Sequence, residues 1–313
     1  MDLSSRIYVA GHRGMVGSAI TRRLLDRGFN AVITRTHDEL PLEDSAAVEH
    51  FFATERPEYV VLAAAKVGGI VANATYGADF IRENLKIQTN VIDAAYRFGA
   101  CKLLFLGSSC IYPRDAEQPI TEEALLTGPL EETNLPYAVA KIAGKTMCDA
   151  YRMQYGFNAF TVMPSNVYGV GDNFHPENSH VVAGMMRRFH EAKLVGAPEV
   201  AVWGSGAPLR ELTDADDLAD ACLFLLRDYD AGGMVNVGSG EEISIRDLAL
   251  LMKSVVGFEG TVVFDSSRPD GTPRKIMDST KLISLGWRPT VNIRTGLAKM
   301  YTWFLESNSL RLN

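Results

Sequence analysis

Five side chains in this sequence form a set that could carry out proton chemistry on a carbonyl compound. Ser108 and Cys110 supply a hydroxyl and a thiol. Tyr137 and Lys141 supply a phenol and an amine, and His180 supplies an imidazole. On a helix the phenol and the amine share one face, where an ammonium would lower the pKa of the phenol and improve it as a proton donor. The thiol and the imidazole can both change protonation near pH 7, so the set suggests reduction of a ketone combined with proton transfer at neighbouring carbons.

Each of these groups also has an ordinary structural interpretation. A tyrosine and a lysine at this spacing occur on many amphipathic helices, where the lysine stem extends along the surface. Cys110 could be a small buried hydrophobic residue, as we expect of the other three cysteines, and His180 could cap a helix or lie on the surface. The position of Ser108 favours the chemical interpretation, because it ends a predicted strand at 102–107, where sites of parallel sheets form.

The elements that position these groups are predicted from hydrophobic patterning. Apolar runs predict strands, and helical spacing predicts the segments between them. The strands are expected at 6–10, 31–35, 59–64 and 102–107, and the helices at 18–27, 46–54, 84–98 and from Tyr137 onward. This alternation predicts the α/β class, with a Rossmann-type, doubly wound parallel sheet. Right-handed crossovers then place the ligand site at the carboxyl edge of the sheet.

The second half of the chain is less regular. A polar loop is expected at 170–179, followed by helices at 181–193 and 216–227 and strands near 200–203, 234–237 and 261–264. We therefore predict a Rossmann domain over residues 1–168, rejoined by about 211–237. A smaller C-terminal α/β domain over 169–313 would bind the substrate.

Three glycines follow the first strand and open the first helix. Gly11 would permit a tight turn, Gly14 would let the backbone approach a pyrophosphate, and Gly17 would let helix and strand pack closely. The second strand ends at Arg35 rather than at an acid, and Arg13 lies inside the glycine turn. An acid at that strand end selects NAD and an arginine selects NADP. The sequence therefore favours NADP(H), although both arginines could simply be solvated.

Composition excludes several other classes of function. The chain has 313 residues, a net charge of −7 and 47% hydrophobic residues, which argues against a general nucleic-acid or membrane-surface binder. The N-terminal residues lack a secretory signal, and no apolar run approaches the ~20 residues of a membrane span. The four cysteines have no metal-ligand spacing. We expect a cytoplasmic protein with no metal site.

Taken in order and spacing, the glycine turn, Ser108, Tyr137 and Lys141 resemble the short-chain dehydrogenase/reductase superfamily, in its extended, nucleotide-sugar-modifying branch. Within that branch the chain resembles the GDP-L-fucose synthases. Motifs spread over nearly the whole sequence carry this resemblance: Ala63–Asn73, Gly107–Pro113, Asp172–His180, Val202–Gly206 and Pro269–Lys275.

The resemblance implies a bifunctional, NADPH-dependent 3,5-epimerase and 4-reductase that converts GDP-4-keto-6-deoxy-D-mannose to GDP-L-fucose. It implies that Cys110 is the base and His180 the acid of the epimerisation. The substrate contacts that it implies are Arg188 and Arg210 at the diphosphate, with Trp203 and Asp270 at the sugar nucleotide. The cofactor contacts that it implies are Gly11, His12, Arg13, Gly14, Met15, Val16, Gly17, Arg35, His37, Leu106, Gly107, Lys141, Pro164, Ser165, Asn166, Val167 and His180. In this branch helices matching 84–98 and the one from Tyr137 pair across a two-fold axis, which implies a homodimer.

Some features depart from related enzymes. Sugar-nucleotide 4,6-dehydratases carry an acid just after the serine, and Ser109 and Cys110 stand there instead, so dehydration is not expected. Thr213 and Asp214 stand where the family usually has bulkier residues, often including a histidine, and His37 stands where a second arginine is common. A reductase or epimerase/reductase of a related GDP-4-keto sugar stays open. So does a non-catalytic NADP-binding regulator, although such a protein would be expected to lose part of the serine, tyrosine and lysine set.

Overall fold

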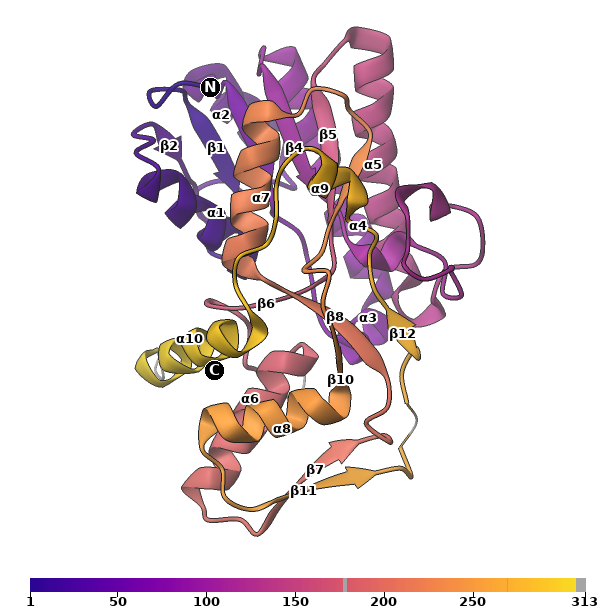
Figure 1. The fold of residues 1–313 in the computed structure, drawn as a ribbon. Coiled ribbons are helices and arrows are strands. Elements are labelled where there is room, and N and C mark those ends of the chain that lie inside the picture. The colour runs from indigo at the N-terminus through magenta and orange to yellow at the C-terminus, as the bar shows by residue number, and fades with distance from the viewer. Residues whose placement is uncertain (177–178, 269, 308–313) are drawn as a thin grey trace.

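The centre of the molecule is a six-stranded parallel sheet with the strand order β2-β1-β3-β4-β5-β9. The computed structural model describes residues 1–176, 179–268 and 270–307. Glu177, Asn178 and Pro269, which belong to two of the motifs above, and residues 308–313 of the predicted C-terminal domain lie outside the described residues. Figure 1 shows the sheet in the upper part of the molecule and a second group of elements below it.

The strands of this sheet are buried on both faces, which explains why their sequences read as continuous apolar runs. Every adjacent pair is parallel, with Val61 opposite Leu104 and Val162 opposite Val235. The strands are β1 (Ile7–Ala10), β2 (Val32–Ile33), β3 (Tyr59–Leu62), β4 (Lys102–Leu106), β5 (Ala159–Pro164) and β9 (Met234–Val237). The predicted α/β class and Rossmann-type sheet are confirmed.

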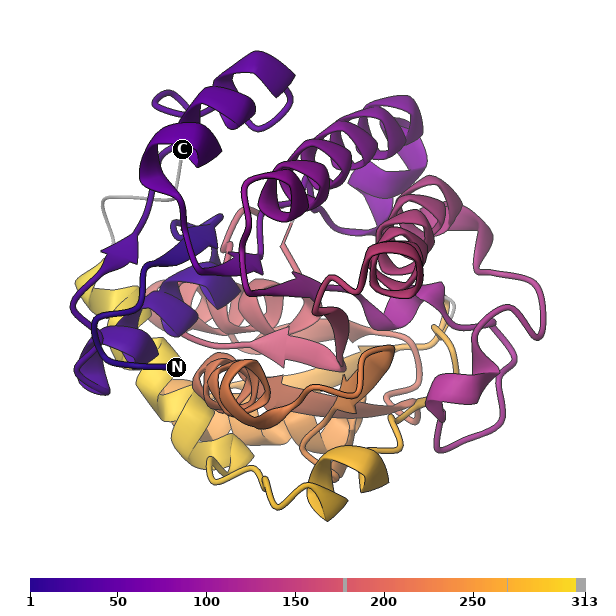
Figure 2. The same cartoon turned by 90° about the horizontal axis from the view of Figure 1, so that it is seen from above.

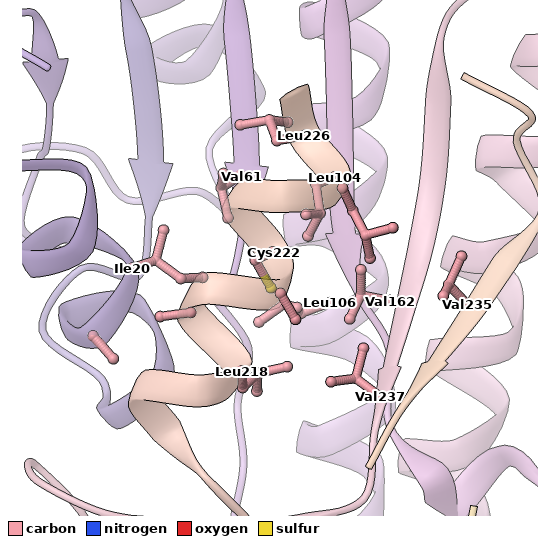
Figure 3. Close-up of a cluster of buried hydrophobic side chains, with 14 of the residues drawn as sticks. Ile20, Val61, Leu104, Leu106, Val162, Leu218, Cys222, Leu226, Val235 and Val237 are labelled. Carbon is pink, nitrogen blue, oxygen red and sulfur yellow. The ribbon is translucent and has the colours of Figure 1, made fainter. Parts of the chain in front are cut away.

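Helices cover the two faces of the sheet as separate layers (Figure 2). One face carries α1 (Met15–Asp26) and α7 (Ala215–Asp228), and the other carries α2 (Ser45–Glu55), α4 (Gly77–Arg97) and α5 (Leu135–Tyr155). Figure 3 shows the first layer, where Leu218 and Cys222 of α7 point at strand residues such as Leu106. Burial of such apolar side chains is the main source of stability for a fold of this type.

The second group of elements contains two smaller sheets and three helices. The strands β6 (Asn166–Tyr168), β8 (Leu209–Asp214), β10 (Glu242–Ser244) and β12 (Arg274–Lys275) form one sheet around β8, and β7 (Glu199–Trp203) pairs in parallel with β11 (Thr261–Asp265). The helices α6 (Val181–Leu194), α8 (Ile245–Val256) and α10 (Ile293–Glu306) share a separate apolar core with these strands.

The chain returns to the main sheet after β12. The short helix α9 (Thr280–Ser284) brings Leu282 and Trp287 into the apolar layer around α7. The indole of Trp287 donates a hydrogen bond to Asp220 of α7 at 3.1 Å. Residues beyond 279 therefore contribute to the core of the six-stranded sheet.

Several elements differ from the sequence prediction. The helix predicted at 84–98 begins at Gly77, where Asp79 lies in the first turn and favours a helix start, and α3 (Ile70–Thr75) precedes it. The second strand is two residues long rather than five. The helices α8, α9 and α10 were not predicted.

None of the helices within the described residues is long and apolar enough to cross a membrane.

Candidate active site

The glycine turn between β1 and α1 has the geometry that the sequence predicted. Gly11 has a φ of 85°, and a Cβ atom there would lie 2.6 Å from the backbone nitrogen of Ala64. A Cβ atom on Gly17 would lie 2.1 Å from the carbonyl oxygen of Gly11. Gly14 caps α1 and has no side chain to cover the first N–H groups of the helix. These groups face the loop as donors for an anion.

The predicted cofactor contacts next to this turn are held in different ways. Arg35 forms an ion pair with Glu55 of α2 and donates to the carbonyl of Thr34 at 2.8 Å, and its guanidinium lies 5.5 Å from the centroid of the Phe51 ring. His37 is exposed, with a side-chain fraction of 73%. Burial, and then the charge of Arg13, lower the pKa of His12. The His12 Nδ1 atom is buried and has no hydrogen-bond partner among the described residues.

The end of β4 carries the hydroxyl and the thiol. Gly107 follows the strand at a point where a Cβ atom would lie 2.3 Å from the Met163 sulfur. Ser108 caps the short helix η1 (Ser109–Ile111), and its Oγ atom accepts a hydrogen bond from the Cys110 N–H at 3.4 Å. Tyr112 ends the turn and donates to the side-chain oxygen of Asn236 in β9 at 2.6 Å. The thiol is thus held on a turn that is anchored at both ends.

The helix α5 brings the phenol and the amine to the same strand end. Pro136 lies in its first turn, which suits proline because no helix carbonyl needs that N–H. The Lys141 Nζ atom donates to the carbonyl oxygen of Leu106 at 2.8 Å, and the Tyr137 side chain hydrogen-bonds to Ser108. The structure therefore brings Ser108, Tyr137 and Lys141 together at the carboxyl end of β4.

The pKa of the Tyr137 phenol was predicted wrongly. Burial raises it, the neighbouring Cys110 raises it further, and the hydrogen bond from Ser108 only partly offsets this. The ammonium of Lys141 lies 5.8 Å from the centroid of the Tyr137 ring rather than against its oxygen. Burial also lowers the pKa of Lys141 to about 8. Tyr137 is consequently a protonated phenol at neutral pH, which is the form that a proton donor needs.

The thiol and the imidazole lie on different elements. Burial raises the pKa of Cys110, while the Ser108 hydrogen bond and the charges of Lys275 and Lys141 lower it. His180 is the N-cap residue of α6, and it is exposed. Within the described residues, no hydrogen bond joins the imidazole to Cys110. The described residues contain no cluster of three or more histidine, cysteine or acidic side chains that could hold a metal ion.

The predicted substrate residues line the second group of elements. Arg188 on α6 donates to the carbonyl of Ala201 at 3.3 Å, and Arg210 on β8 donates to the carbonyls of Leu209 at 2.7 Å and Thr272 at 2.6 Å. Burial lowers the pKa of both guanidinium groups. Neither one has a carboxylate within ion-pair distance among the described residues. Arg188 is exposed, and Arg210 is partly buried and interacts electrostatically with Asp270. Because neither guanidinium forms an ion pair among the described residues, both suit a diphosphate.

Trp203 is the last residue of β7, and Asp270 lies in the segment between β11 and β12. Trp203 is 64% exposed, and Arg268 lies over its ring at 5.1 Å. Asp270 accepts hydrogen bonds from the N–H and the hydroxyl of Ser205 at 2.8 and 2.7 Å. Asp270 therefore shapes the turn that follows Trp203.

The segment from Pro164 to Val167 links the two parts of the molecule. Pro164 ends β5, and Ser165 pairs its hydroxyl with that of Thr213 at 2.7 Å. Asn166 and Val167 begin β6 beside β8. Thr213 and Asp214, which depart from the related sequences, thus have structural roles, since Asp214 caps α7 through the N–H of Asp216.

Sequence reasoning missed the roles of two charged residues, Glu211 and Lys275. Glu211 is fully buried on β8 and accepts from the N–H groups of Gly240 at 2.7 Å and Met277 at 3.0 Å. Lys275 on β12 interacts electrostatically with Cys110. Lys275 ends the motif Pro269–Lys275 that supported the family resemblance, but only the fold shows that it is near the thiol.

Comparisons with known proteins agree with this geometry. Residues 7–238 match the NAD dependent epimerase/dehydratase family. The putative GDP-L-fucose synthase 2 of Arabidopsis thaliana is 62% identical over 307 residues, 98% of this chain and 94% of that protein. The GDP-L-fucose synthase of Escherichia coli (strain K12) is 53% identical over 311 residues, 96% of this chain and 97% of that protein. A GDP-L-fucose synthetase from Naegleria fowleri, solved bound to NADP, superposes with a TM-score of 0.94 at 28% identity, covering 100% of this chain and 96% of that one.

Proposed function

The chain belongs to the NAD dependent epimerase/dehydratase family, and we propose that it converts GDP-4-keto-6-deoxy-D-mannose to GDP-L-fucose. It is an NADP-dependent oxidoreductase that also has epimerase activity. The observation that carries the proposal is the placement of a thiol, Cys110, beside Ser108, Tyr137 and Lys141 at one strand end. A plain ketone reductase has no use for that thiol.

The residues of the glycine turn fit a dinucleotide. Gly11 and Gly17 pack so closely on neighbouring backbone that neither admits a Cβ atom, which keeps the turn tight. The start of α1 offers N–H groups, and the buried Nδ1 atom of His12 has no protein partner among the described residues. We propose that this turn holds the pyrophosphate and that Arg13 and Arg35 contact the 2′-phosphate. When bound, a reduced nicotinamide supplies the hydride for the C4 carbonyl carbon.

In the reduction, Tyr137 donates its phenol proton to the C4 carbonyl oxygen as the hydride reaches the carbon. Ser108 hydrogen-bonds to the phenol and can bond to the same carbonyl oxygen, which polarises it. Lys141 lies behind the phenol, fixed on the Leu106 carbonyl, where its charge stabilises the phenolate that forms when the proton leaves. The products are a secondary alcohol and the oxidised cofactor.

In the epimerisation, Cys110 acts as a thiolate and removes the proton from C3 or C5, both of which are α to the C4 ketone. The electron pair of the C–H bond moves into the carbonyl, so negative charge develops on the C4 oxygen, where Ser108 and Tyr137 stabilise it by hydrogen bonding. His180 then returns a proton from the opposite face, and the carbon is inverted. His180 reaches the substrate from the N-terminus of α6, which explains why its role does not require contact with Cys110.

The substrate diphosphate would lie between Arg188 and Arg210, with the nucleotide along Trp203 and the turn shaped by Asp270. This places the sugar between the second group of elements and the end of β4. We propose the division of labour predicted from the sequence, a nucleotide-binding part over 1–168 with about 211–237 and a substrate part over 169–313, although Leu282 and Trp287 of the latter pack in the core of the main sheet. We also propose that the protein is cytoplasmic and acts as a homodimer through α4 and α5.

The experiment that tests the proposal separates the two activities. Cys110→Ser keeps the size of the side chain but replaces the thiol with a much weaker acid, so proton removal should slow by about 10²-fold or more. His180→Gln should likewise block completed epimerisation. In both variants reduction should persist and yield the unepimerised GDP-deoxyhexose, as identified by NMR of the product.

Two results would contradict the assignment. If either variant still forms the L-sugar at nearly the wild-type rate, the residue has no part in epimerisation. If the wild-type protein reduces a different GDP-4-keto sugar and leaves GDP-4-keto-6-deoxy-D-mannose unchanged, the substrate proposed here is wrong. A protein that binds NADPH and turns over no keto sugar would be a regulator.

A further inference from the structure

The strand β12 carries a lysine toward the proposed base of the epimerisation. In the sheet around β8, Lys275 is the register partner of Arg210. The chain directly after Lys275 is fixed on the segment that follows the Cys110 turn. Ile276 donates to the side-chain oxygen of Gln118 and accepts from the N–H of Ile120, both at 2.9 Å. The N–H of Asp278 donates to the carbonyl of Ile120 at 2.8 Å.

The direction of the Lys275 side chain follows from its neighbour two positions along. Met277 packs in a buried apolar cluster with Ile111 and Tyr112, and Cys110 packs against that cluster. Residues i and i+2 of an extended chain lie on the same face. Lys275 therefore faces the side on which Cys110 lies, and the two groups interact electrostatically.

The ammonium of Lys275 is attracted by the carboxylate of Glu131 but is not ion-paired with it. Lys275 is faced by Cys110, Arg210 and Glu131, and it forms no ion pair within 4.0 Å inside the described part of the chain. Cys110 is faced by Ser108 from its own turn, by Tyr137 and Lys141 from α5, and by Lys275 from β12. Of the two ammonium groups, Lys275 lowers the pKa of the thiol more than Lys141 does.

We propose that Lys275 is a positioning residue for the epimerisation, whose ammonium stabilises Cys110 as a thiolate. This inference rests on the proposed function, because Cys110 is the base only in that reaction. Lys141 is fixed on the Leu106 carbonyl and serves the reduction. A second cation from another part of the fold lets the thiol be tuned without disturbing the phenol. It also couples the base to β12, next to the strand that carries the predicted phosphate ligand Arg210.

The test measures the thiol directly. The rate at which iodoacetamide alkylates Cys110 is followed by peptide mass spectrometry between pH 6 and 10, with exposed Cys101 as the internal reference. In Lys275→Met the midpoint of the Cys110 profile should rise by about one pH unit, so alkylation below the midpoint should be about tenfold slower. Lys275→Arg, which keeps the charge, should restore most of the wild-type profile. Lys275→Gln, made in parallel, gives the same measurement if methionine is not tolerated.

The matched control is Arg274→Met on the same strand. Arg274 forms two hydrogen bonds to Glu242, at 2.6 and 2.7 Å, on the side of the strand away from Lys275, so its loss should leave the Cys110 profile unchanged. A second readout compares solvent deuterium uptake at C3 and C5 with hydride transfer, and only the deuterium uptake should fall in Lys275→Met.

The outcomes separate this inference from the function on which it rests. An unchanged Cys110 profile in the uncharged Lys275 variants, or an equal shift in Arg274→Met, would overturn the role of Lys275 whatever the activity. Absence of turnover of the GDP-keto sugar by the wild-type protein would refute the function, yet the alkylation profile would still report on the Lys275–Cys110 pair.

Discussion

Replacing Lys141 with methionine should change the pH dependence of stability as well as activity. Burial lowers the pKa of Lys141 from 10.5 to about 8, and the residue is only 3% exposed. A shift of this size disfavours the charged lysine in the folded chain by about 3 kcal/mol. Because the folded pKa lies below the unfolded one, the unfolded chain binds more protons between these two values. The free energy of unfolding of the wild-type protein therefore gains a contribution that rises with pH between about 8 and 10.5, and the full cost remains below that window.

The magnitude can be worked out for an accessible pH range. Between pH 7 and 9 the contribution of Lys141 to the free energy of unfolding should rise by about 1 kcal/mol. Lys141→Met lacks this rise, so the difference between the two proteins should change by that amount, or by about 2 °C in the midpoint of thermal unfolding. Loss of the hydrogen bond to Leu106 shifts the difference by a constant and does not alter its pH dependence.

The assay is urea or thermal unfolding of the cofactor-free proteins at pH 7, 8 and 9. Lys145→Met is the matched control, because Lys145 lies one turn further along α5 and pairs with Asp149 at 2.6 Å. Reduction by Lys141→Met should fall by about 10²-fold or more. A difference in stability between wild type and Lys141→Met that stays constant from pH 7 to 9 would refute the argument that Lys141 is held in a desolvated state.

Three further predictions concern other parts of the molecule. Tyr137→Phe should abolish hydride transfer while exchange of substrate C–H protons with deuterium continues at a reduced rate, because Ser108 still bonds to the C4 oxygen; loss of both together would show that the two activities share one acid. Arg35→Asp should weaken NADPH binding, measured by titration, far more than NADH binding; equal losses would remove Arg35 from the 2′-phosphate site. Glu211→Gln should lower the free energy of unfolding by about 1–3 kcal/mol, because an amide NH₂ cannot accept from Gly240 or Met277 in place of the second carboxylate oxygen. An unchanged unfolding midpoint would mean that this buried carboxylate does not hold β12.

The first half of the fold could be predicted from the sequence because its pattern is simple. Strands such as β3 and β4 are buried on both faces and are therefore apolar throughout. The turn at Gly11 is recognisable because no other residue type suits both its φ and its contact with Ala64. Ser108, Tyr137 and Lys141 could be predicted for a related reason, since the chemistry fixes their spacing along a strand end and a helix.

The strands of the second half could not be predicted from hydrophobic patterning, because several of their buried residues are polar. Strand β8 reads Leu-Arg-Glu-Leu-Thr-Asp, yet Glu211 and Thr213 are fully buried, because each is satisfied by hydrogen bonds that only the fold provides. The role inferred for Lys275 was out of reach for the same reason, as its neighbour Cys110 lies far away in sequence. The pKa of Tyr137 was predicted in the wrong direction because spacing on a helix says nothing about burial.

The late arrival of β9 has a consequence for synthesis on the ribosome. Strand β5 is buried along its whole length, but its outer neighbour, β9, begins only at Met234. Until that part of the chain has emerged, the edge of β5 offers unpaired backbone groups and apolar side chains, which is the kind of surface on which nascent chains aggregate. Leu282 and Trp287 complete the adjacent apolar layer later still. A nascent chain that ends near residue 168 should therefore depend on chaperones, although it already contains the glycine turn and four of the five side chains proposed for catalysis.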